Sequence, residues 1–271
     1  MTISDFDGAS YRLSTPDSKT TLVLSMAWKC YSELAAYGAN DIIQREYGSY
    51  VTQPESGYDV SLRFDLTRLG SDKDTLVKKA ALLKRNALAA PFEQAFASQQ
   101  AGKQSSLMVV HYRESEAIYV QAQPDRVTVI FSTLFQEETD RIFGKVFLQE
   151  FVDARRQPAI QSAPQVLYTY REPPMELRGV RGLVDSDSMG YVTFVLFPRH
   201  FATPEAREKC VSLIELFRDY LHYHIKASKA YMHSRMRARV DSFLKVLNRA
   251  KPEAPKDRDM KTASGKSFKR Q

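Results

Sequence analysis

The feature that most constrains this 271-residue chain is the stretch from residue 203 to residue 250, in which no glycine occurs and the only proline is Pro204. Thr203 before Pro204 is typical of a helix start. A threonine side chain can accept a bond from an unpaired amide of the first turn, and proline is tolerated there. Apolar residues recur at helical spacing along the whole stretch. The sequence therefore predicts a single helix of roughly 70 Å, at about 1.5 Å per residue.

Such a helix is longer than one domain is wide, so a single domain cannot bury its apolar stripe along the whole length. Up to Ile225 we expect the stripe to pack on the chain's own core. Beyond Lys226 the body of the domain should end, and an exposed stripe of that length is an aggregation hazard. We therefore expect another chain, most simply a second helix, to cover the remaining apolar positions. This partner-subunit interface is predicted at Met232, Met236, Phe243 and Leu247.

The positive charge of the chain is concentrated at its end. Residues 226–271 contain 14 Lys or Arg and 4 Asp or Glu, a net charge of +10, whereas the preceding residues carry a net charge of −3. The helix dipole favours bases only in the last turn. The excess indicates a polyanionic partner, which can be nucleic acid, an anionic membrane surface or an acidic protein polymer. The candidate contacts on the predicted helix are Lys226, Lys229, Arg235, Arg237, Arg239, Lys245 and Arg249.

Composition and motifs favour a soluble cytosolic protein without a catalytic role. Hydrophobic content of 43% excludes general disorder, and no apolar run reaches the roughly 18 residues of a membrane span. The first eleven residues lack the pattern of a signal peptide. Cys30 and Cys210 are interpreted as buried reduced thiols. His222 and His224 lie about 200° apart on a helix and cannot bind one metal ion together.

No phosphate-binding glycine loop, nucleophile elbow or His-Glu-x-x-His motif occurs. The acid pairs Glu114/Glu116 and Glu137/Glu138 are interpreted as solvated charge. We therefore expect no catalytic residue, no metal and no cofactor.

The order of elements predicts an α+β fold of two α/β domains in which strands are followed by a helix. A helical region over residues 28–47 should be interrupted at Gly38. A capping box at residues 71–74 should begin a helix that buries Leu76, Ala80, Leu83 and Ala87 and breaks at Pro91. Strands are expected at residues 20–26, 49–52, 58–66, 107–112, 117–121, 127–134, 143–151 and 191–197.

The most linker-like segment, residues 99–106, sets the domain boundary. The predicted domains are residues 1–104 and 105–202, followed by the long helix over 203–250, which should pack on domain and partner subunit. Residues 251–271 form a basic tail that should be mobile until a partner binds it.

Several long ungapped stretches resemble subunit 2 of the actin-related protein 2/3 (Arp2/3) complex. The resemblance covers nearly the whole chain. The matching stretches include residues 54–58, 83–86, 125–129, 144–147, 163–167, 171–174, 190–200, 217–226, 235–239 and 243–250.

The resemblance implies two similar α/β sandwich domains followed by a long C-terminal helix, paired with subunit 4 as the core of the complex. It implies contact with the other subunits, including the actin-related proteins, and with the mother actin filament from which a branch is nucleated. The seven bases then become candidate filament contacts. It also implies a non-catalytic subunit of the cytoplasm and cytoskeleton, in actin-rich projections or patches. Family members usually begin further upstream, with an apolar segment before the stretch matching Asp5 to Gly8. That segment is absent here. Either the sequence is a shortened form or gene model, or this version lacks an element that completes the sheet of the first domain, and an open sheet edge would then lower the stability of that domain.

Nucleic-acid binding is the main alternative function, because a basic helix can lie along phosphates. The helix residues 226–249 offer only Asn248 for reading bases, and no exposed aromatic platform is evident. We therefore expect no nucleic-acid partner.

Overall fold

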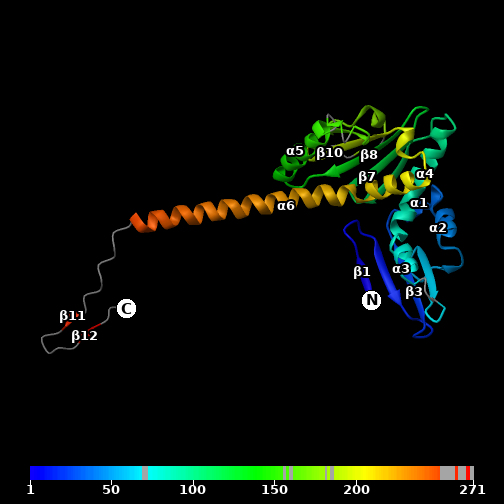
Figure 1. Ribbon diagram of the computed structural model, residues 1–271, viewed down its shortest axis with the longest axis horizontal. Coiled ribbons are helices and arrows are strands. Elements are labelled where there is room, and N and C mark those ends of the chain that lie inside the picture. Colours follow the sequence, from blue (N-terminus) through cyan, green and yellow to red (C-terminus); the bar gives the residue numbers. More distant parts are fainter. Residues whose placement is uncertain are drawn as a thin grey trace. The chain divides into compact units, whose positions relative to one another are not determined.

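The computed structural model describes residues 1–68, 73–154, 157–158, 161–180, 182–183, 186–250, 260–261 and 267–268. Contacts within the chain divide it into two compact units, Met1–Ile225 and Lys226–Gln271. The first unit contains two five-stranded sheets with their helices (Figure 1). The fold class is α+β, as the sequence predicts.

The first sheet is antiparallel and has the order β1-β2-β3-β5-β4. Helices α1 and α2 connect β3 to β4, and Gly38 separates these two helices with a φ of 99° that favours glycine. Helices α3 and α4 follow β5. The bounds are β1 Thr2–Ser4, β2 Ser10–Ser14, β3 Thr21–Ala27, α1 Tyr31–Ala36, α2 Ala39–Tyr47, β4 Val51–Thr52, β5 Val60–Asp65, α3 Lys73–Ala81 and α4 Leu83–Gln100.

The second sheet repeats this arrangement with the order β6-β7-β8-β10-β9, again antiparallel. Helix α5 occupies the position of α1 and α2, and α6 follows the last strand as α3 and α4 do in the first half. The bounds are β6 Met108–Arg113, β7 Glu116–Ala122, β8 Val127–Leu134, α5 Glu138–Ala154, β9 Gln165–Tyr170, β10 Met189–Leu196 and α6 Pro204–Ala250. The two halves of the first unit are therefore similar, as expected.

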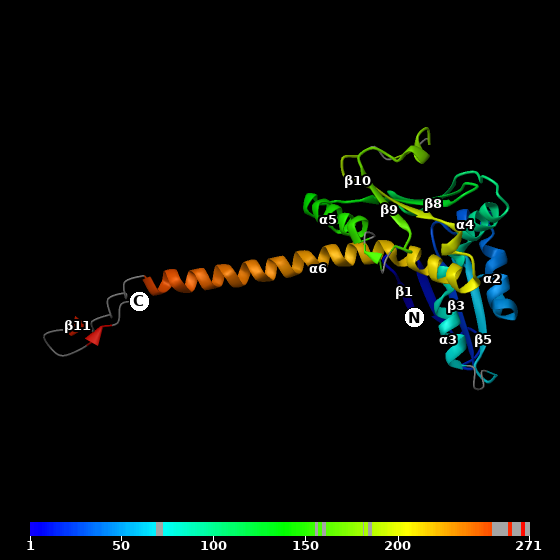
Figure 2. The ribbon, with the colours of Figure 1, turned by 45° about the horizontal axis from the view of Figure 1, so that its top comes forward.

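The buried core of the first unit includes residues of both sheets, of helix α4 and of the first part of α6. Figure 2 shows how the ribbons of these elements are arranged. The Phe217 ring on α6 packs 5.3 Å from that of Phe131 on β8 and 4.7 Å from that of Phe194 on β10. The buried residues of α6 are Cys210, Val211, Ile214, Phe217, Leu221 and Ile225. The prediction that the stripe packs on the chain's own core up to Ile225 is thus confirmed.

The two cysteines are buried and free, as expected. Burial raises the pKa of the Cys30 thiol to about 12 and that of the Cys210 thiol to about 11. Both therefore stay protonated at neutral pH.

The strand predicted at residues 143–151 is wrong, because this segment belongs to helix α5. Its phenylalanine and valine content favours a strand locally. However, Leu148 is fully buried and Phe143 and Phe147 pack against the core at helical spacing. A Cβ on Gly144 would lie 2.9 Å from the Phe135 ring, so this glycine lets α5 approach the core closely. Tertiary packing outweighs the local preference here.

The helix break predicted at Pro91 is also wrong, because α4 continues through it to Gln100. Proline removes one backbone hydrogen bond and favours a kink. Around it, the side chains of Ala87, Ala90, Phe92 and Phe96 are buried in the core. The burial of these side chains stabilises the helical conformation of α4 on both sides of Pro91.

Side chains of helix α1 and of Tyr37, which follows it, contact the outer edge of strand β6. The Tyr37 hydroxyl donates to the carbonyl of Val109 at 3.2 Å and accepts from its amide at 3.0 Å. Glu33 accepts from the His111 amide at 2.7 Å. These bonds satisfy backbone groups that a sheet edge otherwise leaves open, and they tie the first half of the unit to the second.

Some expectations fall outside the described residues. The capping box begins at residues 71 and 72, which are not described, and most of the tail is not described either. In that tail the short strands β11 (Met260–Lys261) and β12 (Ser267–Phe268) form an antiparallel pair. None of the helices within the described ranges combines the length and the apolar character that a membrane crossing requires.

Candidate functional site: helix α6

Helix α6 begins where the sequence predicts. The Thr203 hydroxyl accepts a hydrogen bond from the Ala206 amide at 3.2 Å, so it caps the first turn. Glu205 lies in this turn, and a backbone hydrogen bond and one from Thr203 lower the pKa of its carboxyl. We call residues 204–225 the proximal half and residues 226–250 the distal half of α6.

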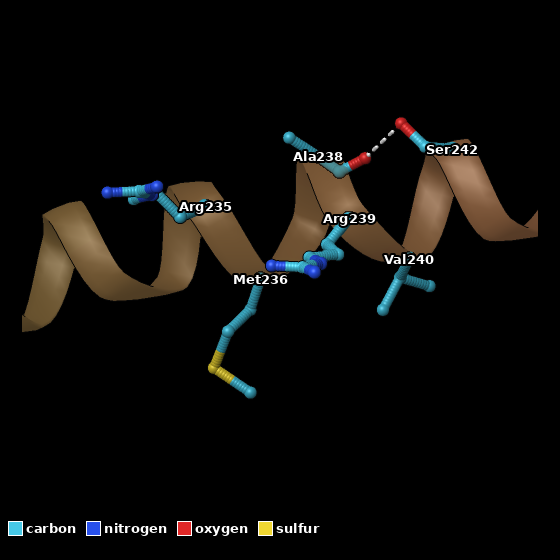
Figure 3. Close-up of a pocket in the computed structure, with 6 residues that line it drawn as sticks. All are labelled: Arg235, Met236, Ala238, Arg239, Val240 and Ser242. Atoms are coloured by element: carbon cyan, nitrogen blue, oxygen red, sulfur yellow. Dashed lines mark hydrogen bonds between the residues drawn. The ribbon is translucent and has the colours of Figure 1, made fainter.

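The distal half carries an exposed row of apolar side chains. Met232, Met236, Phe243 and Leu247 expose 49%, 60%, 63% and 44% of their surface. Together with Val240 they fall within about 80° around the axis, at about 100° per residue. We call these five residues the distal stripe. In Figure 3, Met236 and Val240 project to one side of the helix and Ala238 and Ser242 to the opposite side.

The seven candidate bases surround the distal stripe unevenly. By the same geometry, Arg235 and Arg239 flank the stripe on one side, and Lys226 and Arg237 on the other. Lys229 lies within the sector of the stripe, whereas Lys245 and Arg249 point away from it.

Two of these bases make contacts along the helix. Arg235 donates to the Tyr231 hydroxyl at 3.0 Å and lies over its ring. Lys245 pairs with Asp241 at 2.7 Å, and both side chains are exposed. Among the described residues, Arg237, Arg239 and Arg249 form no ion pair. Their charge is therefore available to an external anion.

The surface around Met236 forms no enclosed pocket. The six residues of Figure 3 come from this one helix and line an open surface. Such an open surface on one helix does not enclose a small ligand.

The predicted interface omits Val240 and Leu244, which are also exposed, by 56% and 48%. Val240 continues the spacing of the stripe, so its periodicity could have identified it. Leu244 lies about 40° beyond Val240, and periodicity alone does not assign it to the stripe.

A buried charge cluster lies between the proximal half of α6 and the elements packed against it, and the sequence analysis missed it. Glu116 on β7 is 6% exposed, which contradicts its interpretation as solvated charge. It accepts from Arg218 Nε at 2.9 Å and from the Leu134 amide at 3.0 Å. The Arg218 partner lies 102 residues away, and nothing in the local sequence around Glu116 indicates it.

A second part of this cluster centres on Lys84 of α4. Its ammonium group lies 2.8 Å from Asp5, 2.5 Å from Asp7 and 3.6 Å from Glu215 of α6. These carboxylates raise the pKa of Lys84 well above its usual range, against the opposing and largest effect of burial. Burial raises the pKa of the Glu215 carboxyl. The cluster ties the β1–β2 turn and α4 to α6.

The histidines of the proximal half take part in packing. The His224 ring stacks on Phe147 of α5 at 4.9 Å, and the His222 ring lies 6.1 Å from Phe135. No group of three or more His, Cys, Asp or Glu side chains within the described ranges is placed to hold a metal ion.

Comparison with known proteins shows the family to which this chain belongs. The family described as Arp2/3 complex, 34 kD subunit p34-Arc matches residues 24–254, which run from within β3 through the second sheet and all of α6. The chain belongs to this family. The family match and the resemblance noted in the sequence therefore agree.

Two curated relatives extend this finding. The actin-related protein 2/3 complex subunit 2 of Schizosaccharomyces pombe is 53% identical over an alignment of 290 residues, gaps included. The alignment covers 99% of this chain and 90% of the relative. The protein of the same name from Dictyostelium discoideum is 41% identical over 269 residues, which cover 98% and 89%. The similarity thus includes the distal half of α6.

Proposed function

We propose that this chain is a scaffold subunit of an Arp2/3 complex that pairs with subunit 4 through the distal stripe and contacts the mother actin filament through the bases of α6. In this role it supports nucleation of branched filaments and carries out no catalysis itself. The observation that carries the proposal is the row of exposed apolar side chains on the distal half, in a chain that belongs to the p34-Arc family.

Burial of the distal stripe supports a stable subunit interface. Burying a Met, Leu, Val or Phe side chain contributes about 1.5–3 kcal/mol. Five such side chains within one narrow sector offer a partner helix a continuous seam. Association costs part of this free energy, and the remainder favours a lasting complex.

The charges of α6 support a filament contact. An acidic filament surface attracts a basic helix over distances of about 8 Å at physiological ionic strength. Arg237, Arg239 and Arg249 have no ion-pair partner among the described residues, whereas Lys245 is paired with Asp241. We therefore rank Arg239 above Lys245 as a filament contact.

The subunit pairing is tested by placing a charge in the stripe. Met236→Asp should prevent co-purification of the full chain with subunit 4, because the carboxylate would be buried without a partner. Val77→Asp is the matched control, since Val77 is 59% exposed on α3 and Met236 is 60% exposed. An intact heterodimer with Met236→Asp would contradict the proposed interface. Phe243→Asp repeats the test about two helical turns further along α6.

The filament contact is tested in the assembled complex by charge reversal. Arg239→Glu should weaken co-sedimentation with filaments, more strongly at low salt than at high salt, because screening reduces the lost attraction. Lys103→Glu makes the same charge change on an exposed loop of the first unit and should have little effect. Equal losses at both salt concentrations would indicate a packing defect. Competition by duplex DNA would favour the nucleic-acid alternative.

We further propose that residues 1–104 and 105–202 are two domains, since each contains one sheet of the repeated arrangement. The proposed site of action is the actin cytoskeleton of the cytoplasm, in actin-rich projections or patches. Fluorescent tagging of the full chain should place it there, and loss of that pattern with Met236→Asp would link location to assembly.

A further inference from the structure

A small cavity lies inside the first unit, where the buried charge cluster meets the core. Side chains from the β1–β2 turn, the segment between β3 and α1, β6, β7, β8, α4 and α6 surround it. They belong to Asp7, Trp28, Leu88, Tyr112, Ile118, Phe131, Glu215 and Arg218. The space open to the centre of a water molecule is ≈ 10 Å³. A cavity that admits the centre of a water-sized sphere is large enough to hold one water molecule.

One side-chain oxygen of Asp7, a residue that lines this cavity, has no hydrogen-bond partner within the part of the chain that the structure describes. Asp7 is 7% exposed, and its Oδ2 binds Lys84, while its buried Oδ1 has no partner among the described residues. Leaving a buried polar group without a hydrogen bond costs about 1–3 kcal/mol, and more for a charged group. Buried carboxylate oxygens are therefore bonded in folded proteins, to protein groups or to ordered water.

The other polar groups at the cavity suit a water molecule in both of its roles. Glu215 presents a carboxylate that can accept a second hydrogen bond from the water. Arg218 carries five N–H donors, of which its contacts with Glu116 and Asp219 use Nε and Nη1. The Tyr112 hydroxyl provides a further polar group, so a buried water could reach the two to four partners that it typically has.

We propose that this cavity is a binding site for one structural water molecule, which donates a hydrogen bond to Asp7 Oδ1 and links it to Glu215 and Arg218 of α6. The water completes the hydrogen bonding of the charge cluster. It connects the turn that precedes β2 with the proximal half of α6, so the first half of the unit is joined to α6 by water as well as by Lys84.

A crystal structure of the intact complex containing this subunit tests the proposal, at a resolution that orders internal waters. We expect one enclosed density peak within hydrogen-bond distance of Asp7 Oδ1. An empty cavity would overturn the proposal, and so would a rotated Asp7 whose Oδ1 accepts directly from a protein donor. Neither outcome depends on the proposed filament contact, which lies on the distal half.

Two variants separate the role of Asp7 from a general effect of charge. Asp5→Asn also removes a carboxylate from Lys84, but Asp5 does not line the cavity. The peak should persist in Asp5→Asn and disappear in Asp7→Leu. A peak of equal height in both would contradict the assignment. If Asp7→Leu does not fold, water-¹⁷O relaxation dispersion replaces the crystal structure of that variant. It should detect a long-lived internal water both in the wild-type complex and in the complex with Asp5→Asn. Absence of a long-lived water from both complexes would also refute the site.

Discussion

The proximal and distal halves of helix α6 have the same apolar spacing but opposite environments. In the proximal half, six apolar side chains from Cys210 to Ile225 are buried against the two sheets. In the distal half, every residue from 231 to 250 is exposed. The same contrast holds for charge, since Arg218 pairs with a buried carboxylate and Lys245 with an exposed one. A helical period thus indicates that a face will be buried, and does not indicate which chain buries it.

The largest expected difference between the halves concerns these two ion pairs. Arg218→Ala should lower the free energy of unfolding by about 3–5 kcal/mol, because it leaves the buried Glu116 charge without its main partner. Lys245→Ala removes an exposed pair one helical turn apart and should cost no more than about 0.5 kcal/mol. Urea unfolding of the full chain measures both. Similar losses for the two variants would contradict the contrast between the halves.

A matched leucine pair tests the apolar side of the comparison. Leu221 is fully buried and Leu247 is 44% exposed. Leu221→Ala should therefore cost about 2–5 kcal/mol, whereas Leu247→Ala should stay within about 0.5 kcal/mol in the isolated chain. The comparison becomes sharper when subunit 4 is bound, since Leu247→Ala should then weaken the pair. An effect of Leu247→Ala that is equal with and without the partner would count against burial of this residue at the interface.

The smallest expected effect is a pH dependence within the proximal half. Burial raises the pKa of Glu215 above its usual 4.5. The folded chain therefore holds this proton at pH values where the unfolded chain has lost it. The associated stability is present below about pH 4.5 and is lost as pH rises through the folded pKa. Glu215→Gln should reduce this decline in unfolding free energy between pH 4.5 and neutrality.

Glu205 in the first turn of α6 provides the opposite sign. Hydrogen bonds lower its pKa, so its contribution is present above pH 4.5 and is lost on acidification. Glu205→Gln should remove that contribution at neutral pH. The same pH trend in both variants would show that the environments of the two carboxyls do not differ as described.

The errors in predicting the fold have a common cause. Composition alone predicts a strand at residues 143–151, and local chemistry alone predicts a helix break at Pro91, because neither takes account of packing against the core. Comparison of the two halves could have corrected the first error, because three strands, a helical segment and two strands follow one another in each. Helix α5 and strand β9 are the counterparts of α1–α2 and β4 in this order. The second error required knowledge of the core around α4, which local sequence does not contain.

The sequence by itself determined the long helix, its start at Thr203, the period of its apolar face and the concentration of positive charge at the chain end. These properties depend on neighbouring residues, and a helix places neighbours predictably. Only the tertiary structure decided that Glu116 pairs with Arg218, and that Asp7, Glu215 and Arg218 surround one cavity. Those contacts join residues about one hundred or more positions apart, and their free energy depends on the packing that brings them together.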